Sequence, residues 1–130
     1  MTVPFWCLFI GVLLPFVWAF SRIPFLKQQL GAPDNKQPRA QSAQLTGKGA
    51  RAVAAQENAW EAITIFAPAV IVNHLAGGDQ GTAPIVCMVW VVARVLHGVF
   101  YITDIDAGRS AVFIVSFVCT ISLFVQAALA

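Results

Sequence analysis

The sequence predicts an all-α integral membrane protein whose four helices form an antiparallel bundle. The 130 residues are 58% hydrophobic and only 11% charged, whereas a soluble domain carries about 25% charged residues. Four apolar runs recur along the chain, and none shows the apolar–polar alternation of a barrel strand. Because only helices and closed barrels satisfy the backbone in lipid, each run is predicted to be a transmembrane helix.

The predicted helices belong to one domain that comprises residues 1–130, and they cover residues 3–20, 50–76, 82–103 and 108–129. A helix needs roughly 20 residues to cross a bilayer. Three of the apolar runs approach this length, and the second reaches it once the stretch from Arg51 is added. The first run lacks the basic start and small-residue cleavage site of a signal peptide, so we expect it to remain as a span.

Residues 21–49 form the one long polar segment, which is predicted to be a loop because glycine and proline recur in it. Asp34 is its only acidic residue, whereas its basic residues are Arg22, Lys27, Lys36, Arg39 and Lys48. The turn 77–81 has no basic residue. The positive-inside rule therefore predicts that the loop is cytoplasmic and that both termini lie outside. The net charge of +2 reflects this topology and does not indicate nucleic-acid binding.

The three cysteines, Cys7, Cys87 and Cys119, each fall within a predicted span and have no CxxC spacing. We interpret them as small apolar core residues. The sequence contains no HExxH motif, P-loop or dinucleotide-binding glycine motif. No metal site is predicted.

Three polar residues share one face of the second predicted helix. At helical periodicity Arg51, Asn58 and Glu61 fall within about 80° of one another. Charged groups in lipid are costly and usually face partners or a water-filled cavity. A ridge of small residues runs beside this face and would let another helix approach closely: Ala52, Ala55, Ala59 and Ala62. The polar face is therefore expected inside the bundle.

The third predicted helix carries a matching stripe, formed by Trp90, Arg94, His97 and Tyr101. Arg94 needs a counter-charge within the membrane, and Glu61 is the candidate. One interpretation is a structural ion pair that fixes the helix register. The other is a polar, ligand-holding pocket between the second and third helices, open to the cytoplasmic side.

Three motifs resemble those of the MAPEG family, the membrane-associated proteins in eicosanoid and glutathione metabolism. They are Arg51 with Asn58-x-x-Glu61, Ala93-Arg94-x-x-His97-x-x-x-Tyr101, and Arg109-Ser110 at the start of the last helix. The resemblance covers nearly the whole chain, and the loop before Arg51 is similar to the bacterial branch.

This resemblance implies a homotrimer in the bacterial inner membrane, with glutathione bound between subunits near the cytoplasmic face. It implies a transferase or peroxidase that acts on small hydrophobic electrophiles dissolved among the membrane lipids. Arg109 would stabilise the glutathione thiolate, with Ser110 beside it, because a guanidinium and a helix N-terminus lower a thiol pKa. The implied glutathione-binding residues are Arg51, Asn58, Glu61, Arg94, His97 and Tyr101.

The sequence departs from the family pattern at several positions. Several glutathione-using members have arginine where this chain has Glu57 and Ala54, and a carboxylate there would repel an anion. Asp104 and Asp106 make the last turn acidic, and we interpret them as turn and helix-start charges. The alternative function is a non-catalytic scaffold that binds lipid or a partner protein. A small transporter is a third possibility, against which the apolar last helix argues.

Overall fold

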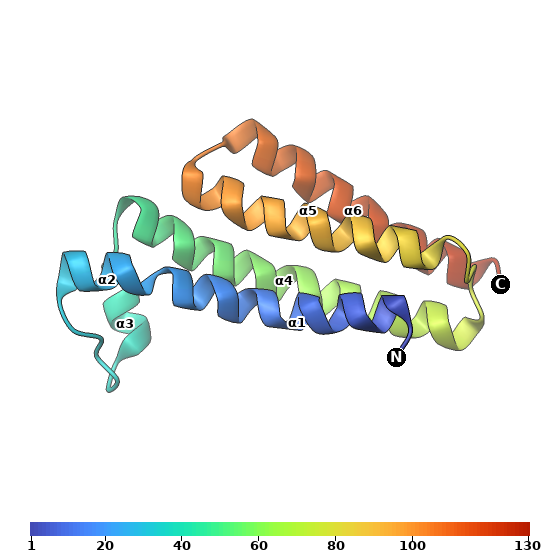
Figure 1. The fold of residues 1–130 in the computed structure, drawn as a ribbon, viewed down its shortest axis with the longest axis horizontal. Coiled ribbons are helices and arrows are strands. Elements are labelled where there is room, and N and C mark those ends of the chain that lie inside the picture. Colours follow the sequence, from blue (N-terminus) through green and yellow to red (C-terminus); the bar gives the residue numbers. More distant parts are fainter.

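The computed structural model describes residues 1–130 as helices joined by short connections (Figure 1). The helices are α1 (Val3–Ser21), α2 (Ile23–Leu30), α3 (Pro38–Ser42), α4 (Gly47–Ala76), α5 (Ala83–Thr103) and α6 (Asp106–Ala128). Four segments are long and apolar enough to cross a membrane. The first is α1 together with its continuation α2, and the others are α4, α5 and α6. The predicted class, an all-α membrane bundle of four helices, is confirmed.

The long helices pack as two pairs, with α1 along α4 and α5 along α6. Contacts of α4 with both α5 and α6, and of α1 with α5, join the pairs. Both termini lie at one end of the bundle, while α2, α3 and the α5–α6 turn lie at the other (Figure 1). We call this second end the basic end, because it carries most of the lysines and arginines.

The segment 21–49 contains two short helices where the sequence predicted a loop. Both begin with a proline in the first turn, Pro24 in α2 and Pro38 in α3. Proline is favoured there because a first-turn N–H has no helical partner. Gly31 then ends α2 with a φ of 85°. Gly31 and Pro38, which contributed to the predicted loop, therefore mark ends of short helices.

A buried cluster between the helices fills the end of the bundle opposite the basic end. Phe66 of α4 stacks on Trp90 of α5 with ring centroids 3.7 Å apart. The three cysteines belong to this cluster and are free thiols, so their interpretation as core residues agrees with the structure. Nearer the basic end, Ala55 and Ala59 pack against the side chains of α1, which brings α1 and α4 together.

Gly98 forms a close contact between α5 and α1. A Cβ atom at Gly98 would lie 2.1 Å from Cζ2 of Trp18. We expect Gly98→Ala to displace Trp18 and to lower the free energy of unfolding by about 1–3 kcal/mol, the usual cost of overpacking. Denaturant unfolding in detergent micelles measures this change. Val95→Ala, on the exposed face of α5, is the matched control; equal stability of the two variants would contradict the contact.

Candidate functional site

Asn58 joins the two charged residues that the sequence expected to form an ion pair. Nη2 of Arg94 donates hydrogen bonds to Oδ1 of Asn58 at 2.6 Å and to its backbone carbonyl at 3.2 Å. Nδ2 of Asn58 in turn donates to Oε2 of Glu61 at 3.1 Å. Arg94 and Glu61 form no direct ion pair, and the counter-charge that the sequence expected for Arg94 is connected to it through the Asn58 amide. An amide carries both donors and an acceptor, and the register of α4 against α5 places Asn58 between the two charges.

Arg94 keeps unused hydrogen-bonding capacity inside the bundle. Its side chain is buried, and its Nη1 atom has no hydrogen-bond partner. A buried guanidinium whose donors are incompletely paired is costly, more so within a membrane. Arg94 is therefore suited to bind a further acceptor, and an anion would suit it best.

A cavity of about 350 Å³ lies between α4, α5 and α6 near the α5–α6 turn, and we call it the turn cavity. Arg109 lies in the first turns of α6, and its guanidinium carbon is 4.4 Å from the centroid of the Tyr101 ring. This cation–π contact holds the cationic side chain at the wall of the cavity. The lining residues are Asn58, His97, Tyr101, Arg109, Ser110, Phe113 and Ile114.

His97 is part of the inner wall of the turn cavity. It is buried, and its ring lies edge-on to Tyr101 at 5.6 Å and tilted against Phe113 at 6.2 Å. The three rings come from α5 and α6 and connect the two helices. His97 thus lies between the aromatic packing of the pair and the polar cavity.

A second cavity, of about 330 Å³, lies deeper between the same three helices, and we call it the deep cavity. It shares Asn58 and Phe113 with the turn cavity. Its polar residues include Glu61 and Arg94, and its other lining residues are Ala62, Thr64, Ile65, Trp90, Ser116, Phe117 and Thr120. The two cavities are therefore neighbours, one polar and cationic, the other lined largely by apolar and hydroxyl side chains.

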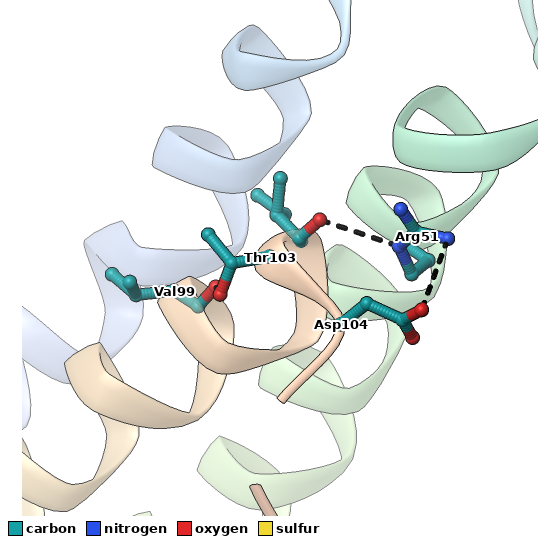
Figure 2. A network of polar contacts seen from close by, with 5 residues as sticks. Arg51, Val99, Thr103 and Asp104 are labelled. Carbon is teal, nitrogen blue, oxygen red and sulfur yellow. Dashed lines mark hydrogen bonds and ion pairs between the residues drawn. The ribbon is translucent and has the colours of Figure 1, made fainter. Parts of the chain in front are cut away.

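Arg51 lies apart from both cavities. Its Nε donates to the backbone carbonyl of Ile102 at 3.2 Å, and its Nη1 is 3.9 Å from the carboxylate of Asp104 (Figure 2). Arg51 thus ties the start of α4 to the C-terminal end of α5. All the other predicted site residues line one of the two cavities. The sequence missed Phe113, whose place between the cavities depends on how α6 packs.

Asp104 ends α5 in the left-handed region, with a φ of 65°. A Cβ-bearing residue in this region costs about 1–2 kcal/mol, whereas glycine enters it freely. We expect Asp104→Ala to be less stable than Asp104→Gly by about this amount, although both lose the Arg51 contact. Thermal unfolding of the two variants in detergent measures the difference. A more stable alanine variant would contradict the turn geometry.

The bundle and its two cavities define a membrane protein with a polar site between helices, set toward the basic end. The family model of the MAPEG family matches residues 3–129, so the chain belongs to this family and the resemblance is confirmed. No curated protein matches the sequence. The membership supports a membrane role related to glutathione in general terms.

Proposed function

We propose that the protein is a membrane-bound, glutathione-dependent transferase or peroxidase that acts on hydrophobic electrophiles. The observation that carries the proposal is the juxtaposition of the two cavities at Asn58 and Phe113. One offers a guanidinium near the start of a helix, and the other offers a largely apolar space at membrane depth. A reaction between a polar thiol and an apolar electrophile needs both environments side by side.

The residues present fit the chemistry of glutathione, which has two carboxylates, an ammonium group and a thiol. Arg94 has a donor without a partner, and Arg109 lines the turn cavity. Glu61 suits the ammonium group, while Asn58 and Tyr101 offer uncharged hydrogen-bonding groups. Both cavities have volumes within the range of roughly 300–1,000 Å³ usual for small-molecule sites. When bound, glutathione would supply a sulfur nucleophile.

Arg109 would keep the bound sulfur deprotonated. Its guanidinium and the nearby N-terminal end of α6 both lower the free energy of a negative charge. Tyr101 would orient Arg109 through the cation–π contact. Ser110 lies beside Arg109 in the same cavity and would donate a hydrogen bond from its hydroxyl group. His97 would form part of the wall of the turn cavity. Arg51 would hold the α5–α6 turn, which precedes Arg109, through its contacts with Ile102 and Asp104.

The apolar part of the deep cavity would receive the hydrophobic electrophile, beside the glutathione groups that Arg94 and Glu61 would hold in the same cavity. Ile65, Trp90 and Phe117 provide apolar contacts, and Phe113 forms part of both cavities. The electrophile would arrive from the bilayer, in which such molecules dissolve. Asn58 and Phe113, which line both cavities, would place the electrophile next to the glutathione sulfur.

The proposed assembly is a homotrimer with the site at the boundary between subunits. Glu61 is exposed on the surface of the single chain although it lies within a membrane-spanning helix. A charged side chain facing lipid is costly, so a neighbouring copy would remove the carboxylate from lipid. We further propose that residues 1–130 form one domain in a bacterial inner membrane. Its segment 21–49 would be cytoplasmic and both termini would be periplasmic.

A non-catalytic scaffold that binds lipid or a partner protein is the second candidate, and the departure of Glu57 from the family pattern favoured it. In this structure Glu57 lines neither the turn cavity nor the deep cavity. Its carboxylate therefore does not face the proposed anion site within one chain. The transferase or peroxidase activity remains the function that the geometry supports best.

The test is glutathione conjugation to a hydrophobic aryl halide, together with reduction of a lipid hydroperoxide, by the detergent-purified protein. We expect turnover that requires glutathione and that falls in Arg109→Ala but persists in Lys48→Ala, whose basic residue is exposed outside the site. Absence of both activities in the wild type would contradict the proposal and favour the scaffold.

A further inference from the structure

A cleft on another face of α4 is not used by the proposed reaction. It has a volume of about 370 Å³ and lies between the α1–α2 junction, α3 and α4. Its charged residues are Arg22 from the junction, Arg39 from α3 and Glu57 from α4. Trp60, one helical turn beyond Glu57, lines its other end. The two arginines come from distant parts of the sequence, and the fold brings them to one cleft.

The lengths of α1 and α4 place the cleft near the expected membrane boundary. The hydrocarbon core requires about 20 helical residues, and a count back along α4 from Ala76 over this length ends at Glu57. The 19 residues of α1 place Arg22 just beyond the same boundary. Trp60 and Phe16, whose rings are 5.3 Å apart, are both exposed on the apolar side. The cleft therefore connects a charged region to an exposed aromatic surface.

The charges of the cleft are available to a ligand. Arg22 donates to the side-chain amide of Gln56, but neither Arg22 nor Arg39 forms an ion pair. Glu57 likewise has no ion-pair partner. Guanidinium groups match phosphate oxygens in geometry and charge. The Glu57 carboxylate beside the two guanidiniums would attract an ammonium group.

We propose that this cleft binds the head group of a phospholipid that carries a primary ammonium, as phosphatidylethanolamine does. The phosphate contacts Arg22 and Arg39, the ammonium group lies against Glu57, and an acyl chain follows Trp60 and Phe16. The site is separate from the turn and deep cavities, so it does not depend on the reaction proposed there. Glu57 has the role of selecting the head group.

Native mass spectrometry of the detergent-purified protein, titrated with phosphatidylethanolamine or phosphatidylglycerol, tests the proposal. We expect the wild type to bind phosphatidylethanolamine about tenfold more strongly, the size of one charge-assisted hydrogen bond. Glu57→Gln should abolish this preference, and Arg39→Gln should weaken the binding of both lipids about tenfold. Lys36→Gln, an exposed residue of the same segment that lies outside the cleft, is the matched control.

Three results would overturn the proposal. Equal or stronger binding of phosphatidylglycerol by the wild type would exclude head-group selection. A preference that persists in Glu57→Gln would place the selecting group elsewhere. Inorganic phosphate alone, if it bound as strongly as the lipid, would show a site for soluble phosphate instead. Because Arg39 and Glu57 are both exposed, their variants should fold, which circular dichroism checks.

Discussion

Asn58→Leu is expected to lower the free energy of unfolding by about 1.5–3 kcal/mol, the usual contribution of a hydrogen bond to a charged group. Asn58 accepts both hydrogen bonds that Arg94 makes, one through its side chain and one through its backbone. Leucine is close to asparagine in size, but it removes the side-chain acceptor. Unfolding of the protein in mixed detergent micelles, followed by circular dichroism, measures the change.

Two further variants test whether Asn58 connects Arg94 to Glu61 or whether the two charged residues interact directly. Arg94→Met combined with Asn58→Leu removes the charge together with its partner, so the double variant should recover most of the lost stability. Glu61→Gln should have a small effect, because a glutamine side-chain oxygen can still accept the one hydrogen bond that the Glu61 carboxylate receives, from Nδ2 of Asn58. If Glu61→Gln proved as costly as Asn58→Leu, the bridging role of Asn58 would be contradicted.

Arg109→Ala is expected to slow the glutathione-dependent reaction by about 10²–10³-fold, the typical effect of removing one group that stabilises a developing anion. Without the guanidinium, the pKa of the bound thiol should rise toward the value of about 8.5 usual for a free thiol. The thiolate fraction at neutral pH then falls, so the rising limb of the pH–rate profile should move to higher pH. Steady-state kinetics across the pH range measures both effects.

Variants of Tyr101 test whether the aromatic ring positions Arg109. Tyr101→Phe keeps the ring that lies 4.4 Å from the guanidinium, so the shift in the pH profile should be small. Tyr101→Leu removes the ring and should show a shift between those of the wild type and Arg109→Ala. An unshifted profile in Tyr101→Leu would mean that the cation–π contact does not orient Arg109.

The sequence predicted the transmembrane architecture well because lipid allows few alternatives. Backbone groups within the bilayer must pair internally, so an apolar run of sufficient length becomes a helix. The polar segment 21–49 is not constrained in this way. There Pro24 and Pro38 lie in the first turns of α2 and α3, and the burial of Leu26 favours the helical conformation of α2.

The candidate site was predictable where it depends on periodicity within one helix. The stripe of Arg94 and His97 on α5 is buried as its spacing predicted. The partner of Arg94 was not predictable, because it depends on the register of α4 against α5. The position of Arg51 outside the two cavities was not predictable for a similar reason. Its contact with Asp104 requires the left-handed turn that ends α5.

Arg109 is proposed to stabilise a thiolate in the turn cavity. The most direct measurement is a glutathione titration of the purified protein, followed by the ultraviolet absorbance of the thiolate, with Arg109→Ala measured in parallel. We predict a signal that saturates in the wild type and is absent in the variant. No signal from the wild type, or an equal signal from Arg109→Ala, would contradict this role of Arg109.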